Sequence, residues 1–167
     1  TSRSRKGPKP GRQVLNVAMV GHAFMGRAHG NALRQVGHFF DLPCRVVPKV
    51  VVGRDAARAA EAARKLGFEE SSADLSAVLA REDIDVVDVA TPNDTHYEIA
   101  MAAMVAKKHV LCEKLLALSL QQAKAMAAMA KRRKVRVGLW HNYRRAPATA
   151  VAARMIARGD IGEVRQV

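Results

Sequence analysis

The sequence predicts an α/β protein with a doubly wound parallel sheet, in which helices cover both faces of the sheet to give three layers. Short apolar runs rich in valine alternate along the chain with longer segments of helical periodicity. These runs lack polar alternation, which is typical of strands buried on both faces. The first run also ends in a glycine-containing turn, residues 21–26, that leads directly into a helical segment.

Composition limits the class of protein. With 167 residues, of which 49% are hydrophobic, the chain has the length and apolar content of one globular domain. No apolar run approaches the ~20 residues of a membrane span, and no apolar signal core begins the chain, which favours a cytoplasmic protein without a membrane partner. Cys44 and Cys112 lie far apart, so the sequence predicts neither a disulfide framework nor a metal site.

The net charge of +13 is concentrated in blocks. Residues 1–12 form a basic leader punctuated by glycine and proline, which is typical of a flexible tail. Residues 131–136 end a predicted helix, where cations interact favourably with the helix macrodipole. Because aromatic residues make up 4% of the chain and no recognition-helix motif is present, we expect no nucleic-acid partner.

The first half of the chain alternates strand and helix twice. The expected elements are a strand at 13–20, a helix at 25–36, a loop at 38–48, a strand at 49–52 and a helix at 56–66. Gly37 ends the first helix, and two prolines without sustained periodicity indicate the loop. Asp55 caps the second helix at its amino end, and Gly67 ends it.

The second half continues the alternation. The expected elements are a helix at 74–80, a strand at 84–90, a helix from 95 to 106, a strand at 109–112, a helix at 120–131, a strand at 135–139 and a helix from Pro147 to about Gly159. Two capping boxes, Thr95 with Glu98 and Ser119 with Gln122, start the middle helices. Proline is well placed in the first turn of the last helix.

Polar residues gather where the predicted strands end. In a doubly wound sheet, ligands bind at the carboxyl ends of the strands. The residues expected at this edge are His22, Arg54, Thr91, Asn93, Glu113, Lys114, Asn142 and Arg144. Their convergence predicts one ligand site along the edge.

The turn at 21–26 has the spacing of the dinucleotide fingerprint G-x-G-x-x-G, with Ala23 at the middle position. Glycine allows positive φ and close approach to a ligand, and the helix that follows offers free N–H groups to a phosphate. Arg27 and Ala28 stand where a Walker A loop needs lysine and a hydroxyl residue, which excludes that loop. A turn from strand to helix that binds nothing remains the alternative.

In this order, the strand-end motifs resemble the Gfo/Idh/MocA family of nicotinamide-dependent oxidoreductases, specifically its amino-terminal Rossmann domain. The resemblance covers nearly all of the chain after the leader. Its motifs are residues 21–26, residues 88–93 with His96, residues 108–114, and residues 142–144 with Pro147, Gly159 and residues 162–163. The sequence departs from the family pattern at Ala23 and at Leu115, where the family has the proline of its E-K-P motif.

The resemblance implies a Rossmann domain at 13–146 and, at 147–167, a helix that starts the connection to a substrate domain absent from this chain. It implies hydride transfer between NAD(P) and a hydroxyl or carbonyl carbon of a sugar, cyclitol or similar polyol, with the chain inactive by itself. We also expect exposed apolar surface and self-association as a homo-oligomer. A non-catalytic nucleotide-sensing or interaction domain is the alternative class.

The resemblance also implies roles for individual residues. Lys114 is the expected catalytic residue, because a lysine beside a reacting hydroxyl or carbonyl can donate a hydrogen bond or a proton. The expected cofactor-binding residues are Gly21, His22, Ala23, Phe24, Met25, Gly26, Gly53, Arg54, Asp55, Thr91, Pro92, Asn93, His96, Glu113, Lys114, Asn142 and Arg144.

The end of the second strand bears on the choice of cofactor. An acidic residue there binds the ribose 2′-hydroxyl of NAD, whereas an arginine accepts the 2′-phosphate of NADP. The sequence places Gly53 and Arg54 at this point, which gives a slight preference for NADP. Asp55 follows directly and keeps NAD open.

Overall fold

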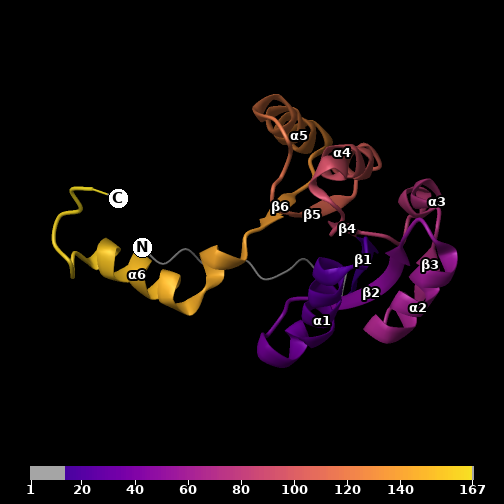
Figure 1. Cartoon of the computed structure of the whole chain (residues 1–167), viewed down its shortest axis with the longest axis horizontal. Helices are drawn as coiled ribbons and strands as arrows, with labels where there is room; N and C mark the ends of the chain where they lie inside the picture. Colours follow the sequence, from indigo (N-terminus) through magenta and orange to yellow (C-terminus); the bar gives the residue numbers. More distant parts are fainter. Residues whose placement is uncertain (1–13, 167) are drawn as a thin grey trace.

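The computed structural model describes residues 14–166, so the predicted leader at 1–12 lies outside the described residues. Within these residues, a six-stranded parallel sheet has the order β3-β2-β1-β4-β5-β6 (Figure 1). The strands are β1 (Val14–Val20), β2 (Arg45–Val52), β3 (Glu70–Ser72), β4 (Val86–Val89), β5 (His109–Glu113) and β6 (Val137–Trp140). The chain starts at the centre of the sheet and winds outward in both directions, which confirms the predicted doubly wound fold.

Helices cover both faces of the sheet (Figure 1). On one face lie α1 (Phe24–Phe39) and α2 (Ala56–Leu66), where Met19 and Val51 pack with Ala63 and Phe68. On the other face lie α3 (Leu75–Ala80), α4 (His96–Val105) and α5 (Leu120–Arg133). Strand residues that point to this face, such as Ala18 on β1 and Val110 on β5, pack there against Met104 and Met126. Because successive side chains of a strand point to opposite faces, each central strand contributes apolar residues to both cores.

Capping hydrogen bonds and a left-handed glycine confirm several predicted helix ends. Asp55 Oδ1 accepts a hydrogen bond from the Arg58 amide at 3.0 Å, and Gly67 ends α2 with a φ of 75°. Ser119 Oγ accepts from the Gln122 amide at 3.2 Å at the start of α5. These caps satisfy amide groups that a helix end otherwise leaves without partners.

The capping box predicted at Thr95 does not form. Its hydroxyl oxygen lies 2.7 Å from both Thr91 Oγ1 and the Pro92 carbonyl oxygen, so it makes no cap to α4. A 3-10 turn, η1 (Asn93–Thr95), precedes α4, which begins at His96 directly after the predicted capping residue. The local polar contacts of the Thr91 loop therefore prevail over the box.

Strand β2 begins at Arg45 rather than at the predicted 49, so part of the predicted loop is strand. The proline that argued against a strand is Pro48, whose carbonyl accepts from the Glu69 amide at 3.2 Å. Pairing of β3 with β2 begins only at Val50, beyond the proline. A register shift of β1 at Val17 accompanies Pro48, and such irregularities are where sheets tolerate this residue.

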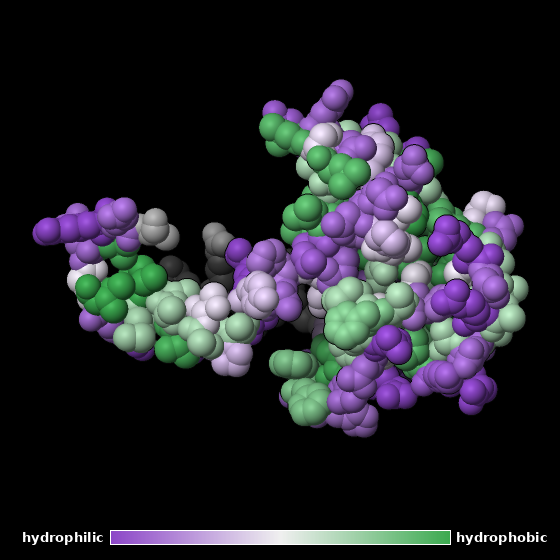
Figure 2. Space-filling view, viewed as in Figure 1, coloured by the Kyte–Doolittle hydropathy of each residue, from purple (hydrophilic) through white to green (hydrophobic). Residues whose placement is uncertain are grey.

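Beyond β6, η2 (Asn142–Arg145) leads into α6 (Pro147–Arg158), which extends away from the sheet (Figure 1). This helix begins at the predicted proline and has no buried residue. Its apolar side chains Val151, Met155 and Ile156 are exposed, and Figure 2 shows apolar surface along this projecting arm. The exposure agrees with the expected apolar surface, while self-association stays a prediction.

No helix among residues 14–166 is long and apolar enough to cross a membrane. In the same part of the chain, no group of three or more His, Cys, Asp or Glu side chains could hold a metal ion. Cys44 and Cys112 are free thiols. The cytoplasmic location stays a prediction.

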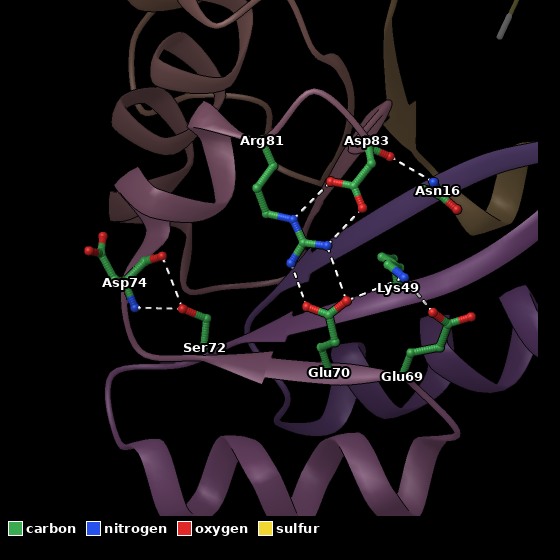
Figure 3. Close-up of polar contacts among 8 residues, drawn as sticks. All are labelled: Asn16, Lys49, Glu69, Glu70, Ser72, Asp74, Arg81 and Asp83. Carbon is green, nitrogen blue, oxygen red and sulfur yellow. Dashed lines mark hydrogen bonds and ion pairs between the residues drawn. The ribbon is translucent and has the colours of Figure 1, made fainter.

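An ion-pair network ties β3 to the segment between α3 and β4 (Figure 3). The Arg81 guanidinium donates to both oxygens of Glu70 and to both oxygens of Asp83. Lys49 on β2 adds a second cation beside Glu70 at 3.3 Å, and its ammonium also pairs with Glu69. Networks of this kind hold a short edge strand that has few apolar side chains of its own.

We expect Arg81→Met to lower the free energy of unfolding by about 1 kcal/mol, because the groups are partly exposed and solvent screens them. Thermal melts should show a drop in Tm of roughly 2–4 °C. The guanidinium lowers the pKa of Glu70 and of Asp83. The substitution should therefore cost its full stability above the unfolded pKa of these carboxyls and progressively less as they become protonated in acid. Arg64→Met, on the exposed face of α2, is the control; equal effects of both substitutions would contradict a role for the network.

Candidate functional site

The register of the sheet aligns the strand ends into one row. Val20 on β1 pairs with Val52 on one side and with Val89 on the other. Gly21 therefore lies between Gly53 and Ala90, and its amide donates to the Val52 carbonyl at 3.0 Å. The row continues because Cys112 pairs with Val89 and with Leu139, so that Glu113 and Trp140 come next.

The turn after β1 requires glycine at its first and last positions. Gly21 has a φ of 93°, and a Cβ there would lie 2.8 Å from the Ala90 carbonyl oxygen. A Cβ on Gly26 would lie 2.2 Å from the Gly21 carbonyl oxygen, so the first turn of α1 rests directly on the loop. Contacts this close leave no room for a side chain, so main chain packs directly on main chain at both positions.

The middle position of the turn has different requirements. Ala23 precedes α1 with a φ of −75°, a value that any L-residue adopts, so its backbone does not need glycine. Ala23 and Phe24 are exposed, Met25 is half-buried, and no side chain caps the amino end of α1. The amide groups of this helix end are thus available for an anion at the edge of the sheet.

His22 and Gly53 close the turn against β2. A Cβ on Gly53 would lie 2.7 Å from Nε2 of His22, so the imidazole lies against the glycine backbone. Arg54 and Asp55 follow at the surface. The side chain of Arg54 is exposed, whereas the Asp55 carboxylate caps α2.

The loop after β4 faces the glycine turn. Thr91 Cγ2 would lie 3.0 Å from a Cβ on Gly21, which places the threonine methyl against the turn. Pro92 and Asn93 follow on the exposed part of the loop. Gly21 and Thr91 therefore pack against each other between β1 and β4, where the winding of the sheet reverses, the position at which such sheets bind ligands.

His96 lies beneath this loop rather than on its surface. It is fully buried, with Nδ1 2.7 Å from the Leu115 carbonyl oxygen and Nε2 2.9 Å from the Thr91 carbonyl oxygen. Both ring nitrogens thus bridge the loops after β4 and β5. The ring is thus enclosed by the protein, and the expected contact of His96 with a cofactor stays a prediction.

Glu113 ends β5, and Lys114 follows it at the carboxyl edge. Glu113 is buried, whereas the side chain of Lys114 is exposed. The Lys114 amide donates to Glu113 Oε2 at 2.9 Å. The peptide bond between Lys114 and Leu115 is cis. Leu115 is not a proline, the residue that the family pattern has at this position.

Sequence reasoning missed a polar cluster under this edge, made of His29, Asp88, Glu113 and Trp140. His29 on α1 lies 3.1 Å from Asp88 Oδ2 and 3.2 Å from Glu113 Oε1. Trp140 donates from Nε1 to Asp88 Oδ1 at 3.0 Å, and its ring centroid is 4.9 Å from that of His29. A signal was present in the sequence: Asp88 is a carboxylate inside the apolar run 86–89 and needs a buried partner.

Asn142 and Arg144 lie apart from the glycine turn. Both are exposed on η2, and Asn142 Oδ1 accepts from the Tyr143 amide at 2.9 Å. Arg144 borders an open hollow of about 530 Å³ with Leu139, His141, Tyr143 and Thr149. These two residues share the carboxyl edge with Lys114, and the described structure gives them no hydrogen bond to the other predicted site residues.

Known proteins resemble this chain in sequence and in fold. A family model described as "Oxidoreductase family, NAD-binding Rossmann fold" matches residues 15–141, from β1 to the end of β6. The chain belongs to the Gfo/Idh/MocA family. Membership explains why the glycine turn, the Thr91 loop and the Glu113–Lys114 pair occur together at one edge of the sheet.

Among Gfo/Idh/MocA relatives, levoglucosan dehydrogenase of Pseudarthrobacter phenanthrenivorans is 44% identical over 91% of this chain and 39% of its own length. A 1,5-anhydro-D-fructose reductase of Ensifer adhaerens is 37% identical over 67% of this chain and 34% of its own length. A solved structure of levoglucosan dehydrogenase in complex with NADH has a TM-score of 0.87 and 44% identity, covering 90% of this chain and 41% of that one. The chain thus spans about two fifths of the length of these relatives.

The carboxyl edge has two features that suit a dinucleotide, in keeping with the NAD-binding Rossmann fold of the family. Backbone at Gly21, Gly26 and Gly53 leaves no space for a Cβ and lines the edge of the sheet. The amino end of α1 supplies uncapped amides beside the turn. A pyrophosphate needs close backbone approach and such a helix end, and both are present.

Proposed function

We propose that the cleft at the carboxyl edge binds NAD and serves an oxidoreductase that acts on a hydroxyl or carbonyl carbon of a sugar or related polyol. The observation that carries this proposal is the glycine cradle, in which a Cβ on Gly26 would lie 2.2 Å from the Gly21 carbonyl oxygen. This contact lets α1 pack directly on the turn after β1, the role of the last glycine in a dinucleotide fingerprint, and it sets the amino end of α1 at the edge of the sheet. Family membership supplies the class of reaction.

In this proposal, each part of the edge has a separate task. Main-chain amides at the amino end of α1, from Ala23 to Gly26, bind the pyrophosphate, while Gly21, whose own amide is bonded to Val52, shapes the turn beside Thr91. When bound, the nicotinamide ring supplies or accepts the hydride. Lys114, exposed at the end of β5, donates a hydrogen bond or a proton to the oxygen of the substrate carbon.

For the cofactor, we propose NAD over NADP. Asp55 lies just beyond the end of β2, where an acidic side chain can accept from the ribose hydroxyls, and a relative of 44% identity has been solved with NADH. Arg54 supports the NADP preference that the sequence predicts, so the two side chains compete for the same end of the cofactor. A sugar substrate is supported by the names of relatives, levoglucosan dehydrogenase and 1,5-anhydro-D-fructose reductase.

Binding of each dinucleotide to this chain tests the proposal. We expect NADH at a hundred times its Kd to stabilise the fold by about 2.7 kcal/mol, seen as a rise in Tm, with a smaller rise for NADPH. Asp55→Asn keeps a side-chain oxygen to cap α2 and removes the charge, so NADH affinity should fall about tenfold while Tm without ligand is preserved. Arg54→Gln is the matched variant, expected to weaken NADPH more than NADH. A chain whose Tm responds to neither dinucleotide would contradict the proposal.

A further inference from the structure

The cluster of His29, Asp88, Glu113 and Trp140 joins four elements beneath the cofactor edge. His29 comes from the second turn of α1, and Asp88, Glu113 and Trp140 come from β4, β5 and β6. The charged members are closed off from solvent, with exposed fractions of 6% for His29, 0% for Asp88 and 7% for Glu113. Two carboxyl groups thus share one buried imidazole.

Geometry determines the protonation of the cluster. Both nitrogens of His29 face carboxylate oxygens, Nδ1 toward Asp88 at 3.1 and 3.2 Å and Nε2 toward Glu113 at 3.2 Å. A neutral imidazole has one N–H and would direct its lone pair at the other carboxylate. The Trp140 indole and the Lys114 amide donate to the same two carboxylates, which fits their ionised form. His29 therefore belongs there as an imidazolium with two N–H donors.

The imidazolium balances two negative charges that neighbouring strands would otherwise hold close together in a buried place. Without it, Asp88 and Glu113 would repel each other, because neither negative charge would have a buried cation beside it. Glu113 also accepts from the Lys114 amide through its second oxygen, Oε2. This hydrogen bond links the position of the Glu113 carboxylate directly to the backbone of Lys114.

We propose that His29 is a positioning residue that, as an imidazolium between Asp88 and Glu113, holds the Glu113–Lys114 turn in place at the nicotinamide end of the cleft. This inference rests on the proposed function for its effect on cofactor binding. The charge state of His29 belongs to the chain without ligand and can be measured separately.

The proposal makes cofactor binding depend on pH. Burial lowers the pKa of His29, but hydrogen bonds and charges from Asp88 and then Glu113 outweigh burial and raise it above its ordinary value. A raised pKa means that the imidazolium persists to higher pH than in an ordinary histidine, and that its contribution is lost as pH rises through the folded value. Asp88 from β4 and Glu113 from β5 face the ring, while Trp140 from β6 carries no charge. Burial raises the pKa of the Cys112 thiol to about 12, so this neighbour of Glu113 stays neutral while His29 titrates.

Two variants on α1 separate positioning from general effects. His29→Gln removes the charge, and His38→Gln makes the same change on the exposed end of the same helix. We expect NADH affinity of the wild type to fall as the pH rises through the pKa of His29, which lies above the ordinary histidine value. His29→Gln should bind NADH about tenfold more weakly at neutral pH, with a flat profile, while His38→Gln matches the wild type.

Nitrogen-15 NMR of the histidine rings gives a second measurement that needs no cofactor. We expect both ring nitrogens of His29 to be predominantly protonated at pH 6.5, where an ordinary histidine is half neutral, and a neutral ring there would overturn the proposal. Equal NADH affinity and an equal pH profile for His29→Gln and the wild type would also overturn it. If His29→Gln does not fold, Glu113→Gln takes its place, and a basic limb retained in that variant counts against the proposal. A wild type with a protonated His29 that binds no NADH contradicts the proposed function instead.

Discussion

Replacing Lys114 with methionine is expected to lower the turnover of the complete enzyme by about 10²- to 10⁴-fold, the contribution of a positioned acid or base. NADH affinity should stay within about twofold, because the Lys114 side chain is exposed and makes no hydrogen bond to the described parts of the glycine turn. Methionine keeps most of the length of the side chain and removes the ammonium group. Steady-state rates with a sugar substrate and a separate NADH titration measure the two effects.

Lys124→Met is the matched control, because Lys124 is an exposed lysine of α5 on the covering layer of the sheet. Its turnover should equal that of the wild type. Unchanged turnover in Lys114→Met would remove this lysine from the reaction and favour the alternative class, a domain that senses nucleotides without catalysis. A parallel loss of NADH affinity and turnover would assign Lys114 to cofactor binding alone.

The parts of the fold that the sequence predicts well are those with strong local signals. Valine-rich runs mark β1, β4 and the end of β2, and Asp55 with Gly67 delimits α2. Strand β3 has no such signal: Glu70 and two serines form a strand because β2 offers an open edge and Arg81 neutralises the glutamate. Tertiary context, rather than propensity, decides segments of this kind.

The site divides in the same way. Residues that follow strands directly are predictable, because parallel strands in register bring their carboxyl ends to one edge. His29 is on a helix and Trp140 closes a strand, and their meeting at Asp88 depends on how α1 crosses the sheet. His96 is predicted from a sequence motif near the site, and the structure places its ring in the interior, between two carbonyl oxygens. Spacing along the chain does not tell which side of a loop a side chain takes.

Gly26→Ala should destabilise the fold and abolish most cofactor binding together. The added Cβ would lie 2.2 Å from the Gly21 carbonyl oxygen, so two main-chain segments must separate. Overpacking of this kind costs about 1–3 kcal/mol of unfolding free energy, which urea titration measures through the transition midpoint. Displacing the turn moves the amides that bind the pyrophosphate, so NADH affinity should fall by more than about tenfold.

The same helix supplies the control, because α1 continues through Gly37, its expected end, to Phe39. A Cβ added to Gly37 would have no described atom from outside its own stretch of helix within 4 Å, so Gly37→Ala meets open space. Alanine is the better helix former by about 1 kcal/mol, so this variant should be as stable as the wild type or more so, with unchanged NADH affinity. If both alanines behaved alike, the cradle between Gly21 and Gly26 would not be what confines the turn. Opposite signs of the two stability changes would assign the effect to the close approach of β1 and α1, because helix propensity favours alanine at both positions.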